Sequence, residues 1–175
     1  MTTQTTEVTV PPAAVLAEGP AVLVLEDGTR FTGRAYGATG QAVGEITVFT
    51  GMSGYQEVLT DQAHTGQILL MATPHIGNTG VNDADSNSDE AGAAGLIVRD
   101  PARRVSNFRA ERSLDEDLVA RGVVGISGID TRAITRRVRS LTTARVGIFS
   151  GESFDLSEDA QLALVVAETS TKETN

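Results

Sequence analysis

Cysteine and tryptophan are both absent from this sequence of 175 residues. Without cysteine the chain has no disulfide, no thiolate metal ligand and no cysteine nucleophile. Lysine occurs once against thirteen arginines, and aromatic residues make up 4% of the chain. Because disulfides mark oxidising compartments, their exclusion is compatible with a reducing one, and we expect the protein to be cytoplasmic.

Long apolar runs are absent as well. No stretch approaches the roughly 18 to 20 apolar residues that cross a bilayer, so we expect no membrane partner. The first twenty residues contain neither lysine nor arginine, and therefore lack the pattern of a signal peptide. A chain of this length fits one domain that buries about two thirds of its unfolded surface.

Positive charge is scarce overall but concentrated in one part of the chain. The net charge is −9, yet eleven of the fourteen basic residues are arginines between Arg99 and Arg145, a span with six acidic residues. This span is either a solvated helical face or a docking surface for an acidic partner. We do not expect nucleic-acid binding, because the chain is acidic and Phe108 is the span's sole aromatic residue.

Local patterns predict the secondary structure. Asp27-Gly28 between two apolar runs predicts a hairpin, since glycine tolerates positive φ. Ser113 and Glu116 form a capping-box pattern that starts a helix ending at Gly122, and Asp130 caps the next helix. Residues 1–19 are expected to form a mobile leader. Further strands are expected at 45–50, 68–72, 96–98, 123–126 and 146–149, with helices at 55–59 and 157–168.

The order of these elements predicts the fold class. Strands come first, and helices then alternate with strands, so we expect an α+β or mixed α/β architecture in a single domain. The stretch 50–83 stands out because polar turn residues surround the short buried strand at 68–72. We therefore expect the site of the protein to lie in this stretch.

Several kinds of site are excluded by their motifs. The glycines between Gly33 and Gly44 match neither the phosphate-binding loop nor the dinucleotide fingerprint. The acidic residues at 83–90 lack the ligand order of a calcium loop, so we expect no metal site. Ser53, His64 and His75 supply a hydroxyl and two imidazoles, but no nucleophile elbow places them, and we expect no catalytic residue.

Several ordered motifs carry a resemblance to a known family. They are Gly54-Tyr55-Gln56-Glu57, Leu59-Thr60-Asp61, Pro74-His75-Ile76-Gly77-Asn78, Asn82-Asp83, Gly95-Leu96-Ile97-Val98-Arg99-Asp100, Ser106-Asn107-Phe108-Arg109 and Ile129-Asp130-Thr131-Arg132. Over residues 20–151 the chain resembles the N-terminal domain of the small, glutamine-hydrolysing subunit of carbamoyl phosphate synthetase. The resemblance implies a swivelling β/β/α-type domain, followed in 152–175 by a helix and linker toward an absent amidotransferase domain.

The resemblance also implies a function. In that family a Cys-His-Glu arrangement in the amidotransferase domain hydrolyses glutamine, so this chain alone is expected to be inactive. Its expected role is to dock to the large synthetase subunit and to help wall the glutamine and ammonia site, in a ligase of arginine and pyrimidine biosynthesis. Expected partners are the large subunit, the chain's own amidotransferase domain, and glutamine at their interface. ATP and Mg are implied for the large subunit, and no cofactor for this chain.

One loop of the family's N-terminal domain reaches glutamine through the serine of a Thr-Asp-Pro-Ser-Tyr run. That run is Thr60-Asp61-Gln62-Ala63-His64 here, so the contact position falls on Ala63, which has no hydroxyl. Asp61 is expected beside the glutamine site, or alternatively to bond its own backbone in an Asx turn. His75, Gly77, Asn78 and Asn82 are expected to shape the neighbouring loop.

A second departure from the family lies at Leu141-Thr142-Thr143, where a Lys-Gly turn is usual. Threonine does not take positive φ as glycine does, so this turn must be built differently. An alternative function also stays open, in which the chain is a free-standing interaction module. Its arginine-rich face, around Arg132, Arg136 and Arg139, would then bind an acidic protein.

Overall fold

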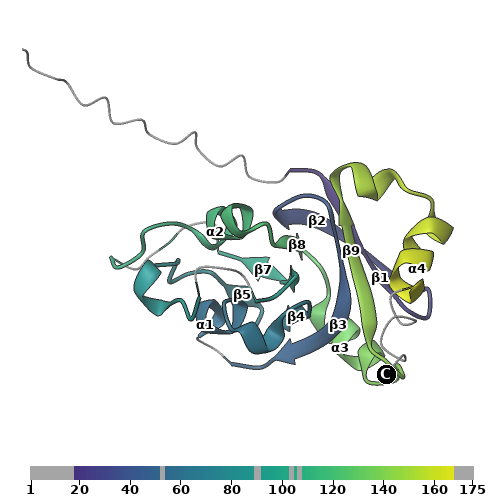
Figure 1. The fold of residues 1–175 in the computed structure, drawn as a ribbon, viewed down its shortest axis with the longest axis horizontal. Helices are drawn as coiled ribbons and strands as arrows, with labels where there is room; N and C mark the ends of the chain where they lie inside the picture. The colour runs from purple at the N-terminus through teal and green to yellow at the C-terminus, as the bar shows by residue number, and fades with distance from the viewer. Residues whose placement is uncertain (1–17, 52–53, 89–91, 103–104, 106–107, 168–175) are drawn as a thin grey trace, which may run out of the picture.

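The computed structural model describes residues 18–51, 54–88, 92–102, 105 and 108–167, which form a single mixed α/β domain (Figure 1). Its strands are β1 Pro20–Leu25, β2 Arg30–Gly37, β3 Gln41–Phe49, β4 Ile68–Met71, β5 His75–Ile76, β6 Gly95–Ile97, β7 Asp100–Pro101, β8 Val124–Ser127 and β9 Arg145–Ser150. Its α-helices are α1 Tyr55–Leu59, α2 Leu114–Arg121, α3 Thr131–Val138 and α4 Glu158–Ala167. Short 3₁₀ turns cover Gln62–His64, Asp83–Asp85 and Gly151–Asp155.

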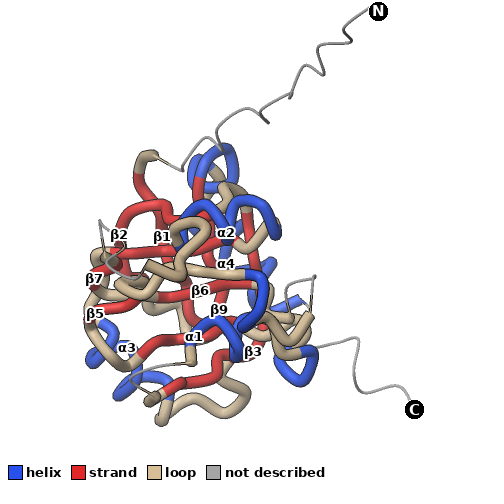
Figure 2. Tube along the Cα trace, turned by 90° about the vertical axis from the view of Figure 1, so that its left-hand side faces the viewer, coloured by secondary structure: helices blue, strands red, loops and turns tan. Residues whose placement is uncertain are grey.

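Seven strands close into a barrel in the order β1, β2, β8, β6, β4, β3, β9. Strands β3, β4, β6 and β8 run parallel to one another, while β1, β2 and β9 join antiparallel to their neighbours. The short strands β5 and β7 form a separate parallel pair outside the barrel (Figure 2). Because the four parallel strands point the same way, their carboxyl ends meet at one edge of the domain.

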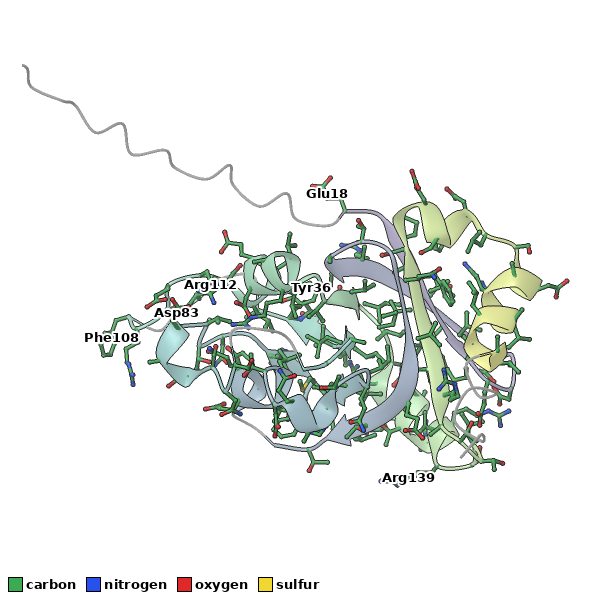
Figure 3. All side chains as sticks on the ribbon, viewed as in Figure 1. Glu18, Tyr36, Asp83, Phe108, Arg112 and Arg139 are labelled. Atoms are coloured by element: carbon green, nitrogen blue, oxygen red, sulfur yellow. The ribbon has the colours of Figure 1, made fainter. Side chains whose placement is uncertain are left out.

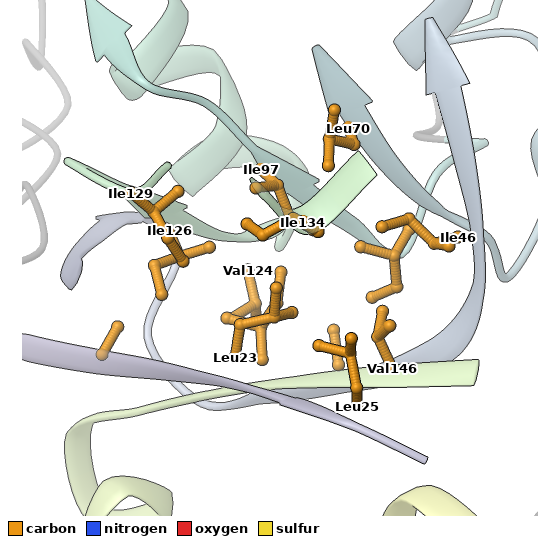
Figure 4. Close-up of a cluster of buried hydrophobic side chains, with 14 of the residues drawn as sticks. Leu23, Leu25, Ile46, Leu70, Ile97, Val124, Ile126, Ile129, Ile134 and Val146 are labelled. Atoms are coloured by element: carbon orange, nitrogen blue, oxygen red, sulfur yellow. The ribbon is translucent and has the colours of Figure 1, made fainter. Parts of the chain in front are cut away.

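The barrel interior is the main hydrophobic core. Figure 4 shows its side chains meeting from opposite walls, with Leu23 and Leu25 of β1 on one side and Ile97 of β6 on the other. Strand β4 is buried at every position because the barrel covers one face and α1 and α2 cover the other. This explains why its sequence is continuously apolar and does not alternate.

Helix α4 covers the outside of β1 and β9. Val165 is fully buried there against Val22, Val24 and Phe149, and the guanidinium of Arg145 donates to the carbonyl of Val165 over 3.1 Å. The neighbouring Leu164 and Val166 stay 36% and 47% exposed, because the helix meets the barrel along one narrow face. The helix is therefore packed onto the barrel.

The local signals in the sequence are confirmed. The β1–β2 hairpin turns at Gly28 with φ 86°, and α2 has the full Ser113–Glu116 capping box and ends at Gly122 with φ 70°. Asp130 accepts the N–H of Ala133 at the start of α3. Strand β3 begins at Gln41, earlier than the expected residue 45, because residues 41–45 pair with β9.

The turn after α3 is built without glycine, as predicted. Ala144 takes φ 50°, and the carboxylate of Glu26 accepts both the N–H of Thr143 over 3.1 Å and its hydroxyl. Burial alone would raise the pKa of Glu26, but hydrogen bonds from Thr143, and then from Arg145 and Ala144, bring it below its usual value. The turn thus takes its positive φ at an alanine and is held by a carboxylate from the β1–β2 turn.

Some predictions concern residues outside the described part of the chain. These are the leader up to residue 17, Ser53, Asp89, Ser106 and Asn107, and the tail from residue 168. Within the part that is described, no helix has the length and apolar character needed to cross a bilayer.

Candidate functional site

Helix α1 is the element to which the polar loop segment 79–87 is fastened. The hydroxyl of Tyr55 lies 2.7 Å from the hydroxyl of Thr79 and donates to the carbonyl of Gly80 over 2.8 Å. Burial raises the pKa of the Tyr55 phenol, so it stays protonated and keeps this donor. The start of the helix is thereby joined to the glycine-containing turn.

The middle of α1 binds the same segment through a buried amide. Gln56 is 6% exposed, and its side chain accepts the N–H of Asn82 over 3.2 Å while donating to the carbonyl of Asn82. The Gln56 amide also donates to the hydroxyl of Ser86 over 2.7 Å. Asn82 in turn caps the next 3₁₀ turn by accepting the N–H of Asp85 over 3.0 Å. Asn82 therefore holds this loop in shape through both its backbone and its side chain.

The end of α1 completes the attachment. The fully buried hydroxyl of Thr60 donates to the carbonyl of Gln56 over 2.8 Å and accepts the N–H of Asn87 over 2.9 Å. The Asn87 amide donates to the carbonyl of Glu57 over 2.8 Å. Since Thr60 directly precedes Asp61, the segment 79–87 and the turn that begins at Asp61 are held by the same short helix.

The turn at residues 61–64 presents Ala63 on the surface. The carboxylate of Asp61 accepts the N–H of Ala63 over 2.9 Å, so Asp61 bonds its own backbone in an Asx turn. A side chain on Gly92 would meet the Asp61 carbonyl oxygen at 2.0 Å, so only glycine lets the backbone pass beneath the turn. Ala63 is exposed, its N–H is already bonded, and its carbonyl remains as the polar backbone group it can offer a ligand.

The two histidines lie in different places. Nδ1 of His64 is 2.8 Å from the side-chain oxygen of Gln67, which also accepts the hydroxyl of Thr47. Nδ1 of His75 is 3.1 Å from the carboxylate of Asp100, across the β5–β7 pair, and both side chains are mostly exposed. Within the described residues, which leave out Ser53, the partners of the two imidazoles are the Gln67 amide and the Asp100 carboxylate, and neither is a hydroxyl group.

The predicted loop residues divide between two neighbours. Asn82 meets α1, whereas His75 lies on β5 and Gly77, with φ 94°, is buried against Leu114 of α2. Asn78 lies between them and is exposed. The loop thus runs from α2 to α1. Its end at α1 is attached to the same helix that leads into the Ala63 turn.

A shallow hollow of about 170 Å³ follows α1. It is lined by Gly54, Tyr55, Gln56, Glu57, Thr79, Gly80, Asn82 and Asp85. Most of these polar groups already bond one another, so the hollow offers a preformed surface and no free nucleophile. Across the described residues no group of three or more histidine, aspartate or glutamate side chains is arranged to hold a metal ion.

A buried charge cluster supports this region and was not predicted from the sequence. Asp117 is 2% exposed, and its carboxylate lies 2.7 Å from the guanidinium of Arg112 and 2.9 Å from that of Arg121. Arg112 continues to Asp83 over 2.9 Å, and Figure 3 shows this pair at the end of the domain that carries Phe108. Arg121 donates to the carbonyl of Ser88 over 3.1 Å. The cluster fixes segment 83–88 to α2.

Comparison with known proteins gives the relatives of the chain. Residues 23–148 match the family model for the carbamoyl-phosphate synthase small chain, CPSase domain. The carbamoyl phosphate synthase small chain of Streptomyces avermitilis is 54% identical over 168 residues, covering 90% of this chain and 44% of that protein. Those of Streptomyces coelicolor and Mycobacterium tuberculosis are 59% and 51% identical, covering 77% and 81% of this chain.

The chain spans less than half the length of these curated relatives, at 44%, 35% and 38% of each. Among solved structures, an aminopeptidase from Aneurinibacillus sp. strain AM-1 aligns with 78% of this chain and 33% of its own, at 19% identity and a TM-score of 0.40. The family match runs from β1 into β9 and so takes in every strand of the barrel. The chain belongs to the carbamoyl phosphate synthase small chain family.

Proposed function

We propose that this chain is the non-nucleophilic N-terminal part of a carbamoyl phosphate synthase small subunit, and that it docks to the large synthetase subunit and walls part of the glutamine site. The exposed Asp61–Ala63 turn carries the proposal. The turn is held in shape by the hydrogen bond from Ala63 to Asp61 and by the packing of Gly92 beneath it. Ala63 exposes only a methyl group, so a bulkier side chain at this position would occupy space in the proposed glutamine site. In this proposal Ala63 touches glutamine through its backbone carbonyl, and Asp61 holds the turn in shape.

The chemistry of amide hydrolysis belongs elsewhere in this proposal. Hydrolysis needs an activated nucleophile, a base and oxyanion donors. This chain has no cysteine, and its two histidines are bonded to Gln67 and paired with Asp100. The nucleophile is assigned to a Cys-His-Glu amidotransferase domain, in the part of the relatives that this chain does not span. The chain alone is therefore proposed to be inactive.

The wider role follows from family membership. In the complete cytoplasmic enzyme, glutamine, bicarbonate and ATP would give carbamoyl phosphate for arginine and pyrimidine synthesis, with ATP and Mg bound by the large subunit. We extend the proposal to the fold type and assign the barrel to the swivelling β/β/α class. Its mixed barrel, with helices outside both the parallel and the antiparallel strands, supports this assignment.

Co-expression with the large synthetase subunit of the same organism tests the docking role. The expected result is a stable one-to-one complex on size-exclusion chromatography. Separate elution of the two chains at micromolar concentration would contradict it. A parallel assay for ammonia release from glutamine by this chain alone is expected to give no signal above buffer, and release that disappears in His75→Ala would favour an independent hydrolase.

A free-standing interaction module is the second candidate, and the exposed arginines of α3 favour it. Arg132 and Arg136 on α3 and Arg139 at its C-cap are all exposed, in a chain that is acidic overall. Such a module would bind an acidic protein other than the synthetase. The co-expression experiment separates the two candidates, because the module forms no complex with the large subunit.

A further inference from the structure

A second hollow lies at the carboxyl ends of the parallel strands, between the end of β4 and α3. It encloses about 210 Å³ and is lined by Ala72, Thr131, Arg132, Thr135, Arg136 and Arg139. The carboxyl edge of parallel strands is where α/β proteins commonly place their binding sites, because loops and helix ends converge there. None of its lining residues belongs to the α1 region described above.

The lining carries three positive charges and no negative one. Arg132, Arg136 and Arg139 follow the spacing i, i+4, i+7, which places them along one face of the helix. All three are exposed, and Figure 3 shows Arg139 at the lower edge of the molecule, pointing away from the body. The hollow is therefore a cationic groove along α3.

The three arginines differ in pairing from their neighbour Arg137. Arg137 forms an ion pair with Asp27 across the hairpin. Within the described residues, no carboxylate lies at ion-pair distance from the guanidinium groups of Arg132, Arg136 or Arg139. The pKa of the helix-capping Asp130 is lowered, first by the N–H of Ala133 and to a lesser extent by the charges of Arg99 and Arg136. The positive charge of the groove is thus left largely unneutralised by the domain itself.

The distance spanned by the three arginines of the groove decides which anion fits. At 1.5 Å of rise per residue, Arg132 and Arg139 are separated by about 10 Å along the helix axis. A single phosphate is too small to contact all three arginines of the groove, whereas several carboxylates on one peptide segment match the spacing of these arginines. Arginine also binds carboxylates through paired hydrogen bonds, which gives such contacts direction.

We propose that this groove on α3 is the socket for an acidic segment of the large synthetase subunit. The inference rests on the proposed docking role and adds the surface that performs it and the chemistry of the partner. The groove supplies the attraction because the rest of the chain has an excess of negative charge, which repels an acidic partner from other faces. Docking through the groove leaves the Ala63 turn, on the other end of β4, free to meet the amidotransferase half.

Charge reversal on α3 tests the inference in the complex with the large subunit. Arg136→Glu is expected to weaken binding at least about tenfold, and a triple reversal at Arg132, Arg136 and Arg139 to abolish it at micromolar concentration. Arg137→Gln is the matched control on the same helix, and its affinity is expected to stay within about twofold of the wild type. Raising salt is expected to weaken the wild type more than Arg136→Glu, because fewer charges remain to be screened in the variant.

The outcomes are distinguishable. If wild type and Arg137→Gln bind while the triple variant binds equally well, the socket assignment is wrong and the docking role stands. If the wild type itself does not bind, the proposed function and the socket fail together. Inorganic phosphate is the competing probe: specific binding of phosphate that is lost in Arg136→Gln, with unchanged affinity for the large subunit, would make the groove a small-anion site and overturn the inference.

Discussion

Asp117 is a buried acidic residue that forms ion pairs with two arginines. Its carboxylate is almost completely buried and faces two guanidinium groups, those of Arg112 and Arg121. Partly buried guanidinium groups are destabilised when the carboxylate that pairs with them is removed. The effect reaches the site, because Arg112 and Arg121 also hold Asp83 and Ser88 of the loop beside α1.

Replacing this carboxylate is expected to destabilise the protein strongly. We predict that Asp117→Asn lowers the free energy of unfolding by about 3 kcal/mol, because Arg112 and Arg121 keep their burial and lose the buried carboxylate that they share, while Arg112 retains only exposed acidic partners. Urea denaturation followed by circular dichroism measures it. Asp83→Asn removes an exposed partner of the same Arg112 and is expected to cost about 0.5 kcal/mol or less. An equal loss of unfolding free energy in the two variants would contradict the claim that burial makes the Asp117 ion pairs more stabilising than the exposed pair with Asp83.

At the scale of residues, short-range signals in the sequence were sufficient and long-range ones were not. The Asx turn at Asp61 joins residues two apart, and its residue type alone suggests it. The pair of Asp117 and Arg121 has a signal in the sequence, opposite charges four residues apart beside the apolar Leu118, but that spacing does not show that Asp117 is buried. The approach of Gly92 to Asp61 depends on packing between separate segments and has no signal in the sequence.

At the scale of elements, α2 shows how caps and charge together define a helix. The hydroxyl of Ser113 accepts the N–H of Glu116, and the Glu116 carboxylate accepts the N–H and hydroxyl of Ser113. These bonds, the backbone N–H first and then the hydroxyl, lower the pKa of Glu116. A lowered pKa means that this stabilisation is present above the unfolded pKa of about 4.3 and is lost as the pH falls through the folded pKa.

The cap therefore predicts a pH-dependent variant. Ser113→Ala is expected to lower the free energy of unfolding by about 1 kcal/mol at pH 7, since it loses the hydroxyl at both bonds. The difference in unfolding free energy between Ser113→Ala and the wild type is expected to narrow below about pH 4. Glu116 becomes protonated there, so the wild type also loses the bonds that its carboxylate accepts. Thermal unfolding at a series of pH values measures this. Ser113→Thr, which keeps a hydroxyl, serves as the control, and a difference that widens at low pH would contradict the sign.

Elements were predicted well where one segment contains its own signal. The hairpin at Gly28, the capping box of α2 and the Asp130 cap all involve neighbours in sequence and were found at the expected places. The extension of β3 back to Gln41 was missed because it depends on pairing with β9, more than one hundred residues away. The glycine-rich composition of this region favours a loop until its partner strand is known.

At the scale of the whole molecule, the closed barrel separates the two regions to which we assign a binding role. The α1 region, with the Ala63 turn, precedes β4, and the arginine groove of α3 lies where β4 ends. Barrel closure joins β2 to β8 and β3 to β9, contacts between distant parts of the chain that periodicity within a segment does not encode. A mixed α/β class was therefore predictable from the sequence, whereas the order of the strands was not.

The proposed wall at Ala63 is tested most directly by the complete two-subunit enzyme carrying Ala63→Glu. Carbamoyl phosphate synthesis is measured twice, once from glutamine and once from supplied ammonia. The glutamine-dependent rate is expected to fall at least about tenfold, because a charged side chain would occupy the wall. The ammonia-dependent rate is expected to stay within about twofold, as is every rate of the control Thr142→Glu, on an exposed turn elsewhere. An unchanged glutamine-dependent rate, or an equal fall in both rates, would contradict the assignment of this turn to the glutamine site.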